Sequence, residues 1–310
     1  MTEISNETRF LHAVEMGLGA WQWGDRMMWQ YGSTHTEDDI RKAFETALAE
    51  GIRFIDTAEV YGSGRSERLL GQFLKGTEQP VLVATKFFPM PWRLFKDAIP
   101  NALKRSLERI GTEAVDLYQI HWPLPIMSID KMMEGMVACL EKGWTRTVGV
   151  SNFNATQMMN AYSALARHSI PLASNQVHYS LLNRKVEKNG LLARCKELGV
   201  RLIAYSPLEM GMLTGKYNPE NPPAGTRNAQ YAGILRKIQP LLKGMTEIGQ
   251  DHGGKSNAQV ALNWLICKET LPIPGAKNAA QSLQNAGALG WRLSEDQVAK
   301  LDEMSDEAVK

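Results

Sequence analysis

Four side chains that can donate, accept or hold a proton stand at or just beyond the ends of successive apolar segments. Asp56 ends the run RFID, Tyr61 follows it in a glycine-containing turn, Lys86 lies near the end of VLVATKF, and His121 ends DLYQIH. A tyrosine hydroxyl has an unperturbed pKa of about 10, which a neighbouring ammonium group lowers by favouring the phenolate. We therefore predict that Lys86 tunes Tyr61 as a general acid. Asp56 would keep Lys86 charged, and His121 would orient a carbonyl oxygen by a hydrogen bond.

Each of these residue types also has an ordinary structural explanation when it is taken alone. An Asp after a strand is commonly a turn residue, a Tyr packs, a Lys at a strand end reaches solvent, and a His can be a satisfied core residue. Their occurrence together at successive strand ends favours a chemical role instead. A general acid of this kind protonates an oxygen on which negative charge develops, as happens when hydride reaches a carbonyl carbon. Because no side chain supplies hydride, the set implies a nicotinamide cofactor.

Eight short apolar runs along the chain are candidates for the strands that position these residues. They lack a polar and apolar alternation, as parallel strands covered by helices do. Their ranges are 13–21, 52–58, 80–87, 114–122, 145–152, 172–179, 200–207 and 270–276. In a barrel of such strands, catalytic residues come from the carboxyl ends of the strands, which is where the polar residues fall here.

Helical segments with recognisable starts lie between the strand candidates. Thr36 precedes one of them, and Asn154, Ser256 and Asn278 are each followed three residues later by Gln, the pattern of a capping box. Strand and helix alternate from about residue 14 to residue 290, which predicts an α/β protein with a parallel sheet. Eight units favour a closed (β/α)8 TIM barrel over an open doubly wound sheet. We expect one domain over 1–310, an N-terminal hairpin or strand, and long loops over the C-terminal mouth.

Composition excludes several other classes of protein. The 310 residues are 44% hydrophobic and 22% charged with a net charge of +2, and the charges are interspersed, which does not favour a nucleic acid or membrane partner. Cys139, Cys195 and Cys267 are far apart and form no C-x-x-C pair, so we expect no disulfide and no metal site. The sequence contains no signal peptide pattern and no apolar run of about 18 residues, and we expect a cytoplasmic protein.

Several segments resemble, in order, those of the aldo-keto reductases. They are FIDTAEVYGSGRSERLLG, VATKF, DLYQIHWP, VGVSNF, NQVHYSLL and AYSPLEMGMLTGKY, within a match from about Gly17 to Leu293. The resemblance implies a (β/α)8 barrel that binds NADPH and reduces aldehydes or ketones. By matching position, Tyr61 would be the proton donor, Lys86 and Asp56 its tuning pair, and His121 the residue that orients the carbonyl.

The resemblance also implies a cofactor site. Ser151, Asn152 and Gln176 would bind the nicotinamide carboxamide, and Tyr205 would stack on its ring. The segment after the seventh strand would surround the pyrophosphate through Ser206, Pro207, Leu208, Gly211, Leu213, Gly215 and Lys216. The segment after the eighth strand would hold the adenosine end through Pro274, Gly275, Lys277, Gln281 and Asn285, with Lys277 near a 2′-phosphate.

Specificity is less determined by the resemblance. Many relatives carry Arg with Ser or Thr where this chain has Lys277 and Asn278, which leaves NADPH favoured over NADH but does not settle the choice. Trp21, which is also expected to contact the cofactor, would form the substrate pocket with Tyr61 and Trp122. The segment PIPGAKNAAQSLQNAGALGWRLS is similar to a plant and bacterial branch that includes pyridoxal reductases. The Gly- and Pro-rich residues 206–232 are expected to cover the barrel mouth.

Two other functions remain to be distinguished from a carbonyl reductase. Potassium-channel accessory subunits resemble the same family and keep the cofactor site, so a nucleotide-sensing regulatory subunit is an alternative. A phosphate-binding barrel isomerase would not explain the set of Tyr61, Lys86 and Asp56. The partner expected on the first reading is a small carbonyl compound, and the oligomeric state stays open. His178, where relatives often carry an acid or a small residue, is expected to be structural.

Overall fold

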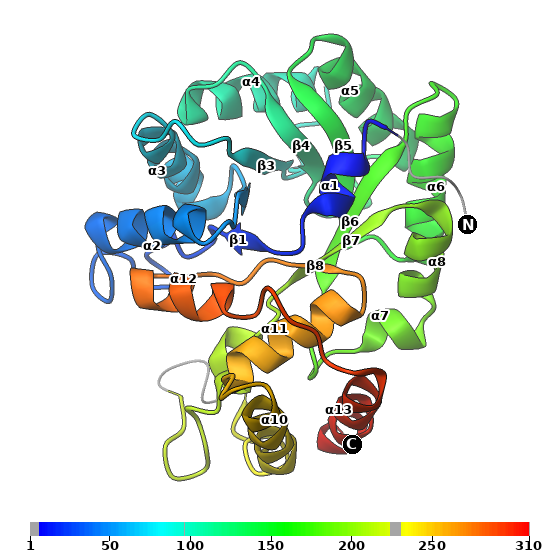
Figure 1. Ribbon diagram of the computed structural model, residues 1–310. Helices are drawn as coiled ribbons and strands as arrows, with labels where there is room; N and C mark the ends of the chain where they lie inside the picture. The colour runs from blue at the N-terminus through cyan, green and yellow to red at the C-terminus, as the bar shows by residue number, and fades with distance from the viewer. Residues whose placement is uncertain (1–5, 96, 224–230, 310) are drawn as a thin grey trace.

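A closed barrel of eight parallel strands forms the centre of the protein (Figure 1). The computed structural model describes residues 6–95, 97–223 and 231–309. The strands are β1 (Gly17–Gly19), β2 (Phe54–Asp56), β3 (Leu82–Phe87), β4 (Val115–Ile120), β5 (Thr145–Ser151), β6 (Leu172–His178), β7 (Arg201–Tyr205) and β8 (Leu271–Pro272). Gly19 closes the ring, because it bridges Gly275 and its amide donates to the carbonyl of Pro274 at 3.0 Å. The predicted (β/α)8 barrel is therefore confirmed, and an open sheet is excluded.

Apart from α1, which precedes the first strand, the helices surround the barrel and follow the strands along the chain (Figure 1). They are α1 (Arg9–Ala13), α2 (Glu37–Ala49), α3 (Arg65–Leu74), α4 (Ala98–Ile110), α5 (Ile129–Glu141), α6 (Ala155–Ala166), α7 (Lys185–Lys188), α8 (Leu191–Leu198), α10 (Gln239–Asp251), α11 (Asn257–Cys267), α12 (Ala279–Ala286) and α13 (Glu295–Ala308), with the 3-10 helices η1 (Tyr61–Gly64) and η2 (Glu209–Thr214). Within the described ranges, none of the helices combines the length and apolar character needed to cross a membrane.

The predicted helix starts are correct, and one of the predicted capping boxes is incomplete. Asn154 and Ser256 each form a complete capping box with the Gln three residues later, and Thr36 caps α2 in the same way with Asp39. Asn278 accepts from the backbone of Gln281, but the Gln281 side chain accepts from the amide of Lys277 rather than from that of Asn278. The second half of that box is therefore absent.

The N-terminal segment differs from the expected hairpin or strand. Ahead of β1, the described residues form the short helix α1, which contains no β-branched residue and so has little preference for a strand. Its Leu11 is fully buried against side chains that point into the barrel, including Phe54 and Leu117. Helix α1 thus closes one end of the barrel and leaves the other end to the polar residues.

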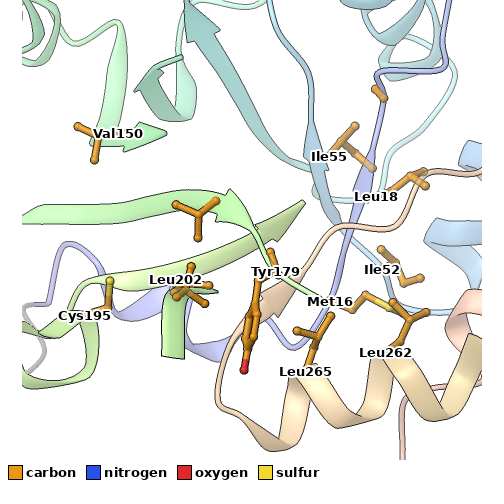
Figure 2. Close-up of a cluster of buried hydrophobic side chains, with 14 of the residues drawn as sticks. Met16, Leu18, Ile52, Ile55, Val150, Tyr179, Cys195, Leu202, Leu262 and Leu265 are labelled. Atoms are coloured by element: carbon orange, nitrogen blue, oxygen red, sulfur yellow. The ribbon is translucent and has the colours of Figure 1, made fainter. Parts of the chain in front are cut away.

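The space between the barrel and its helices is filled by a second apolar layer. Figure 2 shows Leu18, Ile55 and Leu202 from three strands in one cluster with Leu262 and Leu265, which project from α11. Because one set of strand side chains fills the barrel and the other packs against helices, both faces are buried. This explains the absence of alternation in the strand sequences.

Candidate active site

Asp56 and Lys86 form a buried ion pair at the carboxyl ends of β2 and β3. Asp56 pairs in register with Ala84, and Lys86 follows two residues later on the same face. The Lys86 ammonium lies 2.5 Å from Oδ2 of Asp56 and also donates to the carbonyl of Thr57 at 2.8 Å. Lys86 is fully buried, and Asp56 is 2% exposed. The strand register therefore brings together the carboxylate and the ammonium group that were predicted to tune Tyr61.

The second carboxylate oxygen of Asp56 is bound by two amides. Nε2 of Gln176 donates to Oδ1 at 2.8 Å, and Nε2 of Gln119 donates to the same atom at 3.3 Å. Gln176 was expected from the resemblance at a nicotinamide carboxamide, yet its Nε2 is hydrogen-bonded to the acid. Gln119 was not predicted, although a glutamine within the apolar strand DLYQI was a signal that it needed a buried partner.

The phenol of Tyr61 lies between this pair and His121. The Lys86 ammonium is 3.4 Å from the Tyr61 hydroxyl, and the Tyr61 and His121 rings meet edge to face with centroids 5.8 Å apart. Phe88 packs against the other side of His121, with ring centroids 5.5 Å apart. The four residues singled out in the sequence are thus neighbours.

Burial sets the charge states of these groups. Burial, helped by the Lys86 charge, lowers the pKa of His121 to about 3, so this imidazole is neutral at neutral pH. Burial, together with the charge of Asp56, raises the pKa of Tyr61, whereas Lys86 lowers it, and the net shift is upward. Our expectation that Lys86 would leave the phenol with a lowered pKa was therefore wrong, because the desolvation of the phenolate was not considered. Burial lowers the pKa of Lys86, but Asp56 and Tyr61 together outweigh it, and the net shift is upward.

A chain of hydrogen bonds links the ends of the next strands. Ser151 donates to the carbonyl of Gln176 at 2.9 Å, and the side-chain amide of Asn152 donates to Oγ of Ser151 at 3.0 Å and to the carbonyl of His121 at 3.0 Å. The Tyr205 hydroxyl donates to Oδ1 of Asn152 at 3.0 Å. Asn152 has a left-handed backbone with φ of 63°, so these bonds hold it in a strained conformation.

A cavity of about 790 Å³ opens above these residues. This volume is in the range of ligand sites. The predicted site residues that line it are Trp21, Asp56, Tyr61, His121, Trp122, Ser151, Asn152, Gln176, Tyr205, Ser206, Pro207, Leu208, Gly211, Lys216, Pro274, Gly275, Lys277, Gln281 and Asn285. Lys86 lies behind Asp56 and Tyr61, Leu213 is fully buried in the core, and Gly215 packs beside Asn257, so these three do not line it.

Other lining residues were not predicted. They are Gly19, Gln22, Trp29, Val60, Met210, Thr214, Tyr217, Ile273 and Gln284. The aromatic-rich segment GAWQWG was a signal for part of this set. Trp21 lies between Trp29 and Tyr61, with its ring centroid 5.5 Å from that of Trp29 and 6.2 Å from that of Tyr61. One wall of the cavity is therefore aromatic.

The cavity is lined by residues of the kinds that a dinucleotide requires. Tyr205 presents an aromatic ring at the Asn152 end, and the ammonium groups of Lys216 and Lys277 offer positive charge for phosphates. Gly211 lines the cavity with φ of 97°, a conformation that other residues rarely adopt, and it leaves the wall without a side chain there. The residues present thus fit a nicotinamide dinucleotide.

The segment expected to cover the mouth is described in part. Residues 206–217 contribute many of the lining groups, whereas 224–230 lie outside the described residues. Within the described ranges, no three His, Cys, Asp or Glu side chains are grouped as a metal site would need.

The sequence and the fold of this chain both match those of known proteins. Residues 15–306 match the sequence model of the aldo/keto reductase family. The chain is 42% identical to the chloroplastic pyridoxal reductase of Arabidopsis thaliana, over 97% of this chain and 85% of that protein. The glycerol dehydrogenase of Gluconobacter oxydans superposes with a TM-score of 0.83 at 27% identity, covering 96% and 93% of the two chains. An aldo/keto reductase from Klebsiella pneumoniae, solved with NADP and acetate, superposes with a TM-score of 0.73 at 29% identity, covering 94% and 91%.

Proposed function

Because this chain belongs to the aldo/keto reductase family, we propose that it reduces a small aldehyde or ketone to an alcohol with NADPH and with Tyr61 as the proton donor. The observation that carries this proposal is the contact of the Tyr61 hydroxyl with the buried Lys86, at 3.4 Å, beside a neutral imidazole in the wall of a large cavity. NADPH supplies, when bound, the hydride that reduces the carbonyl carbon.

The side chains of this site would then handle the proton. Tyr61 remains protonated at neutral pH because burial raises its pKa, so it can donate to the carbonyl oxygen. Lys86 would stabilise the phenolate that remains, and Asp56 keeps Lys86 charged. Neutral His121 can donate one N–H bond to the same oxygen and orient it.

The same residues suggest how the cofactor would be held. Tyr205 would stack on the nicotinamide ring, with Ser151 and Asn152 near its carboxamide. Lys216 would face the pyrophosphate and Lys277 the 2′-phosphate, because both lysines line the cavity. Gln176 would contact both the cofactor and Asp56, since its Nε2 atom already donates a hydrogen bond to that carboxylate.

A Tyr61→Phe variant tests the proposal. We expect it to abolish carbonyl reduction and to bind NADPH like the wild type, because the ring and its packing remain and only the hydroxyl, with the proton that it donates, is lost. NADPH oxidation with a panel of aldehydes measures the first, and fluorescence titration measures the second. Turnover by the variant at the wild-type rate would disprove the assignment of Tyr61. A wild type that binds NADPH and oxidises none of it with any aldehyde would favour the nucleotide-sensing alternative.

We propose pyridoxal as the first substrate to test. The support is the 42% identity to a protein named pyridoxal reductase and the aromatic wall formed by Trp21 and Trp29, which suits a flat aromatic aldehyde. Steady-state kinetics with pyridoxal, benzaldehyde and a short aliphatic aldehyde would decide. A kcat/KM for pyridoxal below that of the aliphatic aldehyde would argue against it.

A further inference from the structure

We propose that Glu209 is a positioning residue that couples the Tyr205 ring to the turn after β7, so that the nicotinamide and pyrophosphate parts of the cofactor site form together. The carboxylate lies in η2 and is 4% exposed. It is not needed for the proton transfer described above, yet it is bound by three side chains from outside its own turn. The inference rests on the proposed binding of NADPH in this cavity.

The first connection runs from Glu209 to Tyr205 through His178. Nε2 of His178 donates to Oε1 of Glu209 at 2.5 Å. The imidazole is stacked on the Tyr205 ring, with centroids 5.4 Å apart and an angle of 15° between the planes. One face of Tyr205 is thus covered by a ring that Glu209 holds in place. Tyr205 is fixed at its other end by the bond from its hydroxyl to Asn152, at 3.0 Å.

The second connection runs to two further segments. Oε1 also accepts from the hydroxyl of Ser180 at 2.6 Å, and Oε2 accepts from the hydroxyl of Tyr231 at 3.1 Å. Ser180 follows β6, and Tyr231 is the first described residue after 224–230. The carboxylate therefore joins the end of β6, the turn after β7 and the segment that precedes α10.

The backbone of the turn explains why such an anchor is needed. Ser206, Glu209 and Met210 all have left-handed backbones, with φ of 51°, 47° and 50°. A conformation of this kind is unfavourable for residues other than Gly and persists only where surrounding contacts fix it. Ser206, Met210 and Gly211 from the same turn line the cavity. Glu209 thus fixes the wall expected at the pyrophosphate as well as the ring expected at the nicotinamide.

The coupling predicts which part of the cofactor is affected when the carboxylate is lost. The adenosine end would be held by Lys277, Gln281 and Asn285, which belong to the segment after β8 and to α12. None of the three side chains that bind Glu209 comes from that segment. A change at Glu209 should therefore weaken the binding of NADPH and spare the binding of adenosine 2′-monophosphate, which carries only the adenosine end.

The experiment compares the dissociation constants of these two compounds for the wild type and for Glu209→Gln and Tyr231→Phe. We expect Glu209→Gln to weaken NADPH binding about tenfold, because it removes the charge from several hydrogen bonds, and Tyr231→Phe to weaken it about threefold. The binding of adenosine 2′-monophosphate should change less than about twofold in both. A His178→Phe change should be non-additive with Glu209→Gln, because the two residues act through one contact.

A His252→Ala variant is the matched control. His252 also packs against an aromatic ring, that of Trp291 with centroids 4.6 Å apart, and forms a hydrogen bond with the side-chain oxygen of Gln297 at 2.8 Å, but it does not line the cavity. It should bind both compounds like the wild type. Equal losses for both compounds in Glu209→Gln and Tyr231→Phe, or unchanged NADPH binding in both, would overturn the proposal. Binding is measured without a carbonyl substrate, so a wrong role for Tyr61 would not alter this result.

Discussion

The ammonium nitrogen of Lys86 lies 2.5 Å from Oδ2 of Asp56, and neither side chain has more than 2% of its surface exposed. Each of these buried charges needs the other as a partner, because burial has removed the hydration that water would supply. Gln176 and Gln119 bind the other carboxylate oxygen and leave Asp56 with a set of donors suited to its ionised form. The pair should therefore contribute to the stability of the barrel as well as to the chemistry proposed for it.

Removal of only one charge should be more harmful than removal of both. We expect Lys86→Met to reduce the free energy of unfolding by about 3–5 kcal/mol, because it leaves Asp56 buried without its cation. The double variant Asp56→Asn with Lys86→Met should recover part of that loss. Urea unfolding of the three proteins measures the difference. A double variant less stable than Lys86→Met alone would show that the pair is not coupled in this way.

The stability of the protein should depend on His121 at mildly acid pH. Its pKa is lowered to about 3 in the folded protein and is near 6.5 when unfolded, so between these values the unfolded chain binds more protons. His121 therefore lowers the free energy of unfolding only below about pH 6.5. As the pH falls further, this free energy decreases by up to about 1.4 kcal/mol per pH unit.

Urea unfolding from pH 4 to pH 7 would measure this dependence. His121→Asn should show a shallower loss of stability than the wild type across that range, because the titrating group is absent while other acid-labile groups remain. Identical slopes for the two proteins would mean that the imidazole is protonated in the fold at a pH near its ordinary value.

The two directions of the reaction should respond differently to pH. Because burial raises the pKa of Tyr61, its protonated form dominates throughout the range from about pH 6 to pH 9. We therefore expect the kcat for carbonyl reduction to be flat over that range. Alcohol oxidation with NADP needs the phenolate and should rise about tenfold per pH unit. Stopped-flow single turnovers isolate the chemical step. A fall in the reduction rate centred below pH 8 would contradict a raised pKa.

Strand periodicity and strand-end residues were sufficient to predict the barrel and the neighbourhood of its reactive groups. Asp56, Lys86 and His121 were placed together because parallel strands in sequence order bring their carboxyl ends to one edge, and that rule depends only on topology. Leu213 was an exception. It lies in the kinked 3-10 helix η2, where no regular period indicates which side chains face inward, and its side chain packs into the core instead of lining the cavity.

Contacts between distant segments could not be predicted from local patterns. His178 stacks on Tyr205 and is hydrogen-bonded to Glu209, which lies 31 positions further along the chain. Glu209 itself stands in a turn with left-handed backbone conformations. The direction in which the pKa of Tyr61 shifts depends on the balance between burial, which raises it, and Lys86, which lowers it. Only the packed structure gives that balance. Sequence alone identifies a charge next to the phenol and leaves its surroundings undetermined.

Closure of the barrel depends on two glycines that should differ in their tolerance of a methyl group. A Cβ on Gly19 would lie 2.9 Å from the carbonyl oxygen of Ile273, a backbone atom that cannot move without opening the seam between β1 and β8. A Cβ on Gly275 would lie 2.6 Å from the side-chain amide of Gln22, which can rotate away. We expect Gly19→Ala to destabilise the protein by about 1–3 kcal/mol and Gly275→Ala by less than about 1 kcal/mol.

Gly76→Ala is the control for this comparison, because a Cβ there would meet only the carbonyl of Phe73 at an ordinary 3.5 Å. Thermal and urea unfolding of the three variants would rank them, with Gly76→Ala nearest to the wild type. NADPH titration adds a second measurement, since Gln22 lines the cavity and its displacement in Gly275→Ala should weaken binding even where stability is kept. If Gly275→Ala were as unstable as Gly19→Ala, the Gln22 amide would have to be as fixed as the backbone at the seam.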